Sequence, residues 1–248
     1  MFSTNPFFRT QSFLQRGISR EEGVMTINGV VTKTIVLLLC TALTFIWSWQ
    51  QFFSPQGNPQ LAFSALQVGG LAGFILALVT SFKREWSPAT APLYALCKGC
   101  VLGGISALLE RSYPGIAFQA ITLTCTTLFA MLIIYRMRLI QVTEKFVFGI
   151  TAVTCGVCLF YLCSFLFSLF GVASPIYGTS LFSIGFSLFV VVLAASHLLL
   201  DFHMIERGEA HGLPKYMEWY SALGLLITLF WLYIEIIQLL SKIARRRD

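Results

Sequence analysis

The sequence predicts an all-α integral membrane protein, a bundle of seven transmembrane helices. Seven apolar stretches of about 20 residues follow one another from Val30 onward, and each is long enough to cross a hydrocarbon core of about 30 Å. Only 11% of the residues are charged, against roughly 25% in an ordinary soluble domain. The alternation of polar and apolar residues that marks a membrane β-strand is absent, so we expect helices throughout.

The predicted spans fill almost all of the chain. An N-terminal arm, residues 1–29, is polar and is expected to lie in the cytoplasm. The transmembrane domain covers residues 30–241 and a basic C-terminal tail covers residues 242–248, which leaves no room for a soluble domain of about 100 residues. In chain order, the predicted spans are Val30–Trp49, Leu61–Phe82, Pro92–Leu109, Gly115–Tyr135, Phe146–Phe170, Thr179–Leu200 and Trp219–Leu240.

The second, third and fourth spans carry the small and hydroxyl residues that favour close helix packing. Gly69 and Gly73 form a small-xxx-small pair on the second span, and Gly103 and Gly104 lie on the third. Small residues let helix backbones approach, and hydroxyl groups hydrogen-bond across the contact. We therefore expect a compact bundle. The hydroxyl residues of the fourth span are Thr122, Thr126 and Thr127.

Two Cys-x-x-Cys pairs lie inside predicted spans. Cys97 and Cys100 belong to the third span, and Cys155 and Cys158 to the fifth. Neither pair has the flanking histidine or acidic residues that a zinc site uses. Because buried cysteine behaves as a small hydrophobic residue, we expect no metal centre, no disulfide framework and no cofactor.

The last two spans carry the best lead to function, because each contains an acid. Asp201 ends the sixth span and Glu235 lies in the seventh. An acid in hydrocarbon costs about 3 kcal/mol or more unless it faces a partner or water. Each acid shares a helix face with small or polar residues, so both point to where polar groups collect. These faces are Ser183, Ser187, Ala194, His197 and Asp201, and Ser221, Gly224, Thr228, Glu235 and Gln238.

A structural interpretation stays open for each of these charges. Asp201 is placed to cap or solvate the end of its helix, and Glu235 to reach the far interface. Lys98, inside the third span, either extends along its stem to the interface or pairs with an acid in the bundle. His197, one turn before Asp201, is either a hydrogen-bonded packing residue or a titrating group coupled to that acid.

The basic loops predict the orientation, because short loops rich in Lys and Arg stay cytoplasmic. The arm and three loops fall on one side, whereas the loops at 50–60 and 171–178 carry no charge. The N terminus is therefore predicted to be cytoplasmic. The basic tail would then lie outside, so either it is an exception or the last segment is re-entrant; we expect seven full spans. The basic residues of the three loops are Lys83, Arg84, Arg136, Arg138, Lys145, Arg207 and Lys215.

Enzymes and nucleic-acid-binding proteins are not indicated. The sequence contains no nucleophile–base constellation and no phosphate-binding glycine loop. The net charge of +6 fits basic cytoplasmic loops rather than nucleic acid. A proton-coupled transporter would show internal repeat symmetry, which the sequence lacks. The lipid bilayer is the one partner that the composition itself implies.

Several motifs resemble the Bax-inhibitor superfamily of seven-helix membrane proteins, especially its bacterial YccA-like and Bax-inhibitor-like branch. The resemblance covers nearly the whole chain, from Asn5 to the C-terminal tail. The motifs that carry it are Gly103-Gly104-Ile105-Ser106, Tyr113-Pro114-Gly115-Ile116 with Gln119-Ala120, Thr143-Glu144-Lys145-Phe146, Leu200-Asp201-Phe202, Pro214-Lys215-Tyr216-Met217-Glu218-Trp219-Tyr220 and Leu232-Tyr233-Ile234-Glu235.

This resemblance implies a pH-sensitive calcium leak in a bacterial inner membrane. Asp201 and Glu235 match the two family acids that share a proton and gate a central path, so both would hold calcium transiently. Two neighbouring carboxylates cannot both ionise cheaply in a poorly hydrated site, and their oxygens suit Ca²⁺. A proton and a calcium ion would compete for the pair, and an acidic constriction would select cations.

Four departures from the family pattern bear on this expectation, and the charge reversal at Lys98 favours a second class of function, whereas the paired acids favour the leak. Glu235 stands where many relatives carry aspartate, and Lys98-Gly99 reverses the charge of an acidic family position. Lys83 or Arg84 would be the basic latch of some relatives, but the local match is poor. The segment Glu206–Lys215 is also longer than in the shorter members. The alternative is therefore a non-conducting regulator that binds another membrane protein, such as a quality-control protease.

Overall fold

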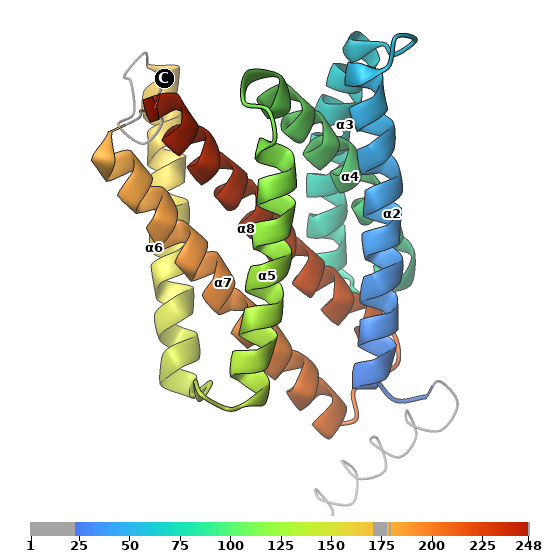
Figure 1. Cartoon of the computed structure of the whole chain (residues 1–248). Helices are drawn as coiled ribbons and strands as arrows, with labels where there is room; N and C mark the ends of the chain where they lie inside the picture. Colours follow the sequence, from blue (N-terminus) through green and yellow to red (C-terminus); the bar gives the residue numbers. More distant parts are fainter. Residues whose placement is uncertain (1–22, 171–177, 179, 248) are drawn as a thin grey trace, which may run out of the picture.

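A computed structural model describes residues 23–170, 178 and 180–247, and the regular elements in these ranges are helices. By length and composition, seven helices in this part of the chain are able to cross a membrane. The predicted all-α bundle of seven transmembrane helices is thereby confirmed (Figure 1). The helices are α2 (Ile27–Phe53), α3 (Pro59–Phe82), α4 (Ser87–Ser112), α5 (Ile116–Arg136), α6 (Glu144–Leu169), α7 (Leu181–Ala210) and α8 (Met217–Arg247), with a short 3-10 helix η1 (Arg84–Trp86) before α4.

Capping residues explain where several helices begin. Thr26 and Asn58 precede α2 and α3, and their side chains accept hydrogen bonds from backbone N–H groups of the first turn. Helix α4 begins at Ser87, ahead of the predicted membrane span that starts at Pro92, and Pro88 lies in its first turn. A proline there gives up an N–H group that would have no partner within the helix.

Some predicted boundaries lie outside the described residues. These are the arm as far as residue 22, the loop residues 171–177, Thr179 and Asp248. Residues 242–247, predicted as a separate tail, continue α8 as far as Arg247. This extension contains neither glycine nor proline, so nothing in the sequence ends the helix at the membrane boundary.

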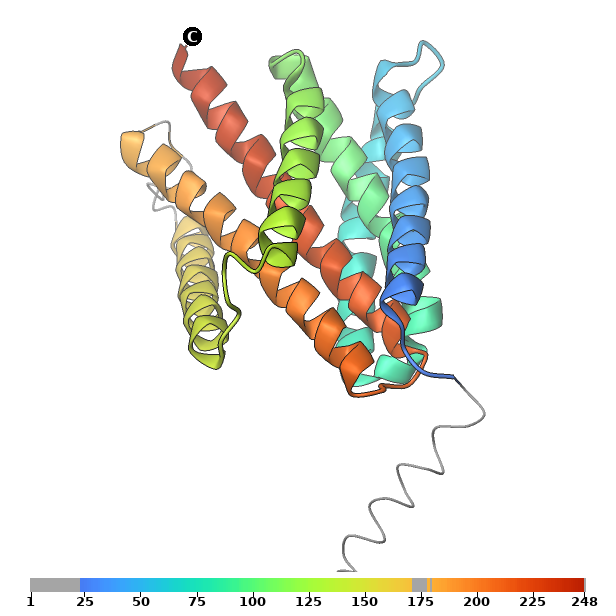
Figure 2. The ribbon, with the colours of Figure 1, turned by 60° about the horizontal axis from the view of Figure 1, so that its bottom comes forward.

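Helix α8 forms the centre of the bundle. It packs against α2, α4, α5 and α7, and it crosses the bundle obliquely in Figures 1 and 2. Its side chains Leu226, Leu232 and Ile237 are fully buried. Helix α4 also packs against α2 and α3, whereas α6 packs mainly against α7. Helix α7 therefore lies between the outer helix α6 and the group formed by α2, α3, α4, α5 and α8.

Glycine allows the closest helix contacts. A Cβ atom added at Gly103 of α4 would lie 2.5 Å from the carbonyl oxygen of Phe45 on α2. A Cβ at Gly69 of α3 would lie 2.7 Å from the carbonyl oxygen of Cys97 on α4. Both distances are too short for a methyl group, so these glycines let α4 approach the backbones of two neighbours, as the sequence predicted.

The basic loops gather at one end of the bundle. The start of α2, the turn between α3 and α4, the loop between α5 and α6 and the loop between α7 and α8 lie at the lower end in Figure 1. Helix α8 ends at the opposite end, so it runs through the whole bundle as one unbroken helix, as a full span requires. We call the lower end the basic end.

Candidate functional site

Asp201 lies on α7 near the basic end, against α8. Its carboxylate contacts the side chain of Thr228 on α8. Its Oδ2 atom is buried and has no hydrogen-bond partner among the described residues. A buried carboxylate oxygen without a partner is costly, and a proton, a water molecule or a cation relieves that cost. Asp201 is therefore the strongest candidate for an ion- or proton-binding residue.

A small cavity adjoins Asp201 between α3, α7 and α8. Its volume is ≈ 120 Å³, which holds more than one water molecule. Besides Asp201, the polar residues in its lining are Thr80, Ser81, Tyr220 and Ser221. Hydroxyl oxygens beside a carboxylate form an oxygen-rich environment, which suits a hard cation or a hydrated proton.

Glu235 occupies a separate site between α6, α7 and α8. Its side chain is 4% exposed. The indole Nε1 of Trp231 donates to its Oε1 at 3.2 Å, and the hydroxyl of Tyr161 donates to the same oxygen at 3.3 Å. Lys242, toward the end of α8, interacts electrostatically with this carboxylate, and its Nζ donates to the Ser187 hydroxyl at 2.7 Å. The carboxylate is thus held by donors on two helices.

The structure does not bring the two acids together as one pair. Asp201 contacts Thr228, and Glu235 lies two turns further along α8, a rise of about 10 Å. Antiparallel packing of α7 with α8 puts the two carboxylates at different depths. The resemblance implies one shared proton, whereas the geometry gives two sites in succession along one helix interface.

His197 belongs to the Glu235 side of this interface. Its Nε2 lies 2.7 Å from the hydroxyl of Thr154 on α6, and its ring packs edge-on against Trp231 with centroids 5.5 Å apart. Trp231 in turn donates to Glu235. His197 therefore connects α6 to α8, and its ring nitrogen has a partner on α6 rather than Asp201.

None of the three predicted basic accessory residues forms a salt bridge with an acid among the described residues. The Nζ atom of Lys98 is 5.6 Å from the ring centroid of Tyr94 on its own helix, and that of Lys83 is 4.5 Å from the ring of Trp86. Arg84 lies 5.3 Å from the ring of Tyr220, a residue that lines the Asp201 cavity. Of the three, Arg84 is the one that the structure links to an acid site.

The sequence interpretation missed the most strongly bonded acid of the described chain, Glu218. Its side chain is fully buried at the start of α8. Its Oε1 accepts hydrogen bonds from the backbone N–H and the hydroxyl of Thr26, both at 3.0 Å, and lies 2.7 Å from Nζ of Lys215. Its Oε2 pairs with Lys33 of α2. This cluster joins the start of α2 to the start of α8.

Two signals in the sequence point to the Glu218 cluster. Lys33 is a charge inside the first predicted span, and such a charge needs a buried partner. Glu218 lies in the motif Pro214–Tyr220, which the resemblance singled out without a role. Gly29 completes the arrangement, because a Cβ atom at that position would overlap the Glu218 carboxylate.

Comparison with known proteins adds one match. A family model described as Bax inhibitor 1 like matches residues 5–245. The comparisons with curated proteins and with solved structures gave no match.

Proposed function

The chain belongs to the Bax inhibitor 1 like family, and from this premise we propose that it is a pH-sensitive calcium leak whose ion-binding group is Asp201. The protein contacts the lipid bilayer through its seven apolar helices. Calcium is the transported ion, and protons compete with it for the carboxylate. We assign the chain no catalytic activity, no cofactor and no nucleic-acid partner.

The observation that carries this proposal is the buried Oδ2 atom of Asp201, which lacks a partner among the described residues. The adjoining cavity of ≈ 120 Å³ supplies hydroxyl oxygens for an ion that has shed part of its water. When the carboxyl is protonated, it loses the negative charge that attracts Ca²⁺. Calcium flux therefore falls as the pH falls.

Glu235 is the second acid of the proposed path. Asp201 contacts Thr228 on α8, and Glu235 lies two turns beyond Thr228 on the same helix, nearer the opposite end of the bundle. Two weak sites in succession suit conduction better than one strong site, because an ion must leave as readily as it enters. Trp231 and Tyr161 hold Glu235 in the closed bundle, so opening requires these hydrogen bonds to break.

We further propose that the basic end faces the cytoplasm of a bacterium, with the chain in the inner membrane. Four basic segments share this end, and short loops rich in Lys and Arg stay on the cytoplasmic side of a membrane. Asp201 then lies toward the cytoplasm and Glu235 toward the outside.

A second candidate function is a non-conducting regulator that binds another membrane protein, such as a quality-control protease. The outer position of α6 favours it, since α6 packs mainly against α7 and leaves its other faces uncovered. Phe148, Leu159 and Phe165 are among its exposed side chains. A transmembrane helix of a partner fits such a face without a change in the rest of the bundle.

Calcium influx into liposomes distinguishes the two functions. Purified full-length protein is reconstituted with an entrapped calcium indicator, alongside empty liposomes, Asp201→Asn and the control Glu144→Gln, which removes an exposed acid at the start of α6. We expect influx above empty liposomes for the native chain and the control, and a large loss for Asp201→Asn. Folded protein without influx would contradict the leak and favour the regulator.

A further inference from the structure

A second and larger cavity lies on the side of the bundle; it shares Ile205 with the Asp201 cavity, but neither acid of the proposed path lines it. This groove has a volume of ≈ 700 Å³ and is formed by α2, α5, the loop after α5, α7 and one residue of α8. Its floor is buried and apolar, with Val30, Ile205 and Leu225. The volume falls in the range of sites for small ligands, about 300–1,000 Å³.

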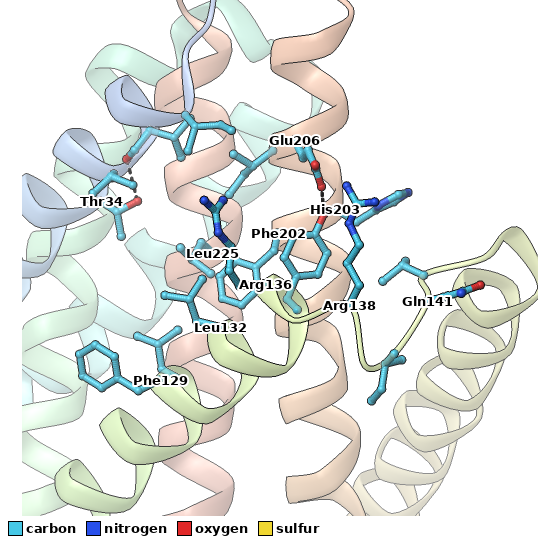
Figure 3. Close-up of a pocket in the computed structure, with 18 of the residues that line it drawn as sticks. Thr34, Phe129, Leu132, Arg136, Arg138, Gln141, Phe202, His203, Glu206 and Leu225 are labelled. Carbon is cyan, nitrogen blue, oxygen red and sulfur yellow. Dashed lines mark hydrogen bonds between the residues drawn. The ribbon is translucent and has the colours of Figure 1, made fainter.

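The groove changes from apolar to basic along its length. Figure 3 shows Phe129 and Leu132 at one end, Arg136 beyond them beside Leu225, and Arg138 beside His203 on the other side. Phe129 and Arg136 are two turns apart on the same helix, a rise of about 10 Å. The apolar part thus lies at the depth of the spans, and the basic part lies at the basic end.

The two arginines are available to an anion. Neither forms a salt bridge with a described residue, because the salt bridges among the described residues join Glu218 to Lys33 and Lys215. The acid in the lining, Glu206, accepts a hydrogen bond from the hydroxyl of Tyr135. The rim therefore carries two unpaired guanidinium groups, one carboxylate already bonded to a neighbour, and one imidazole.

We propose that this groove binds an anionic phospholipid, with an acyl chain between α2 and α5 and the phosphate on Arg136 and Arg138. Arginine pairs with phosphate through two parallel N–H donors, and basic pockets between membrane helices recognise anionic headgroups. Val31 and Leu132 are exposed side chains that a bilayer lipid would cover. This proposal is independent of calcium conduction.

Charge argues for a lipid rather than the arm of the same chain. The arm contains Arg9, Arg16 and Arg20 but only two acids, Glu21 and Glu22, so its net charge is not negative and would not neutralise the basic rim. A second copy of the chain would bring the same basic rim to the contact. An anionic lipid supplies both the negative charge and the apolar chain.

Native mass spectrometry of the full-length protein in detergent tests the proposal. The probes are palmitoyl-oleoyl phosphatidylglycerol, the matching phosphatidylcholine, and excess inorganic phosphate as competitor. The charge variant is Arg136→Gln with Arg138→Gln, and its control is Arg207→Gln, a basic residue outside the lining. The filling variant is Leu132→Trp, and its control is Ile133→Trp, its exposed neighbour outside the groove.

We expect one phosphatidylglycerol bound in preference to phosphatidylcholine, with no displacement by phosphate. The double arginine variant should weaken this binding by about tenfold or more, and the two controls should not change it. Leu132→Trp should weaken it with both charges in place, which decides the matter if the arginine variant does not fold. A photo-crosslinking residue at position 132 should label the lipid.

Four results would overturn the lipid site. They are equal retention of both lipids, full binding by either groove variant, displacement by inorganic phosphate, and cross-links to the arm or to a second copy instead of lipid. Displacement by phosphate would reduce the site to a simple anion site.

Discussion

Removal of the Glu218 carboxylate should destabilise the protein strongly. Glu218→Ala deletes the acceptor of two hydrogen bonds from Thr26 and the partner of Lys33 and Lys215. Lys33, whose side chain is 19% exposed, then lies beside the fully buried position 218 without a carboxylate to pair with. The link between the first and last helices of the bundle is lost at the same time.

The expected cost follows from these contacts. The Lys215 side chain is 47% exposed, so its ion pair contributes only about 0–1 kcal/mol. Breaking a buried ion pair by removing one partner costs about 3–5 kcal/mol, because the other charge stays buried. Lys33 extends partly into solvent, so we expect about 3 kcal/mol for Glu218→Ala. Glu218→Gln should cost less, because its amide oxygen still accepts from Thr26.

Unfolding of the purified protein in detergent measures this cost. The matched control is Glu209→Gln, which removes an exposed carboxylate that accepts one hydrogen bond, from the backbone N–H of Ile27 at 2.9 Å. The control should lose about 1 kcal/mol or less. Equal stability of Glu218→Ala and the control would refute the buried cluster. Loss of the Glu218 effect in high salt would show that the pair is exposed and screened.

Two other substitutions test the packing of the bundle. Gly103→Ala should cost about 1–3 kcal/mol of stability, because its Cβ would lie 2.5 Å from the Phe45 carbonyl oxygen. The control Gly70→Ala, where the added Cβ has no atom within 4 Å, should be neutral or slightly stabilising. Equal thermal stability of the two variants would contradict the contact of α2 with α4. Tyr233→Phe should lose about 1 kcal/mol of stability, since the Tyr233 and Ser106 hydroxyls lie 2.6 Å apart in the core. In denaturant unfolding, the double variant with Ser106→Ala should lose less than the sum of the losses of the two single variants. Full additivity would show that the hydroxyls do not interact.

The fold was predictable because the bilayer leaves few alternatives. Apolar length alone predicts each span, and every predicted span maps onto one helix in the described part of the chain. Boundaries were less certain where a proline is tolerated in the first turn, as at Pro88. Hydropathy predicts where the last span ends but not where the helix ends, and α8 continues through the basic tail as far as Arg247.

The candidate site was only partly predictable. Sequence spacing placed Asp201 and Glu235 on polar faces, but the register of α7 against α8 decides whether they meet, and no single-helix pattern contains that register. Lys33 and Glu218 are far apart in the sequence, so their pairing required the tertiary structure. Arg136 and Arg138 entered the sequence analysis only as orientation signals, whereas their place beside an apolar groove depends on how four helices pack.

The most direct test of the proposed function is the pH dependence of calcium influx into liposomes by the native chain and by Asp201→Asn. For the native chain, influx should fall as the pH is lowered from about 8 to about 6, because protons displace calcium from the carboxylate. For Asp201→Asn, influx should be low and flat across this range, since an amide does not titrate. A variant that keeps the native pH dependence would contradict the assignment of Asp201 as the site where protons and calcium compete.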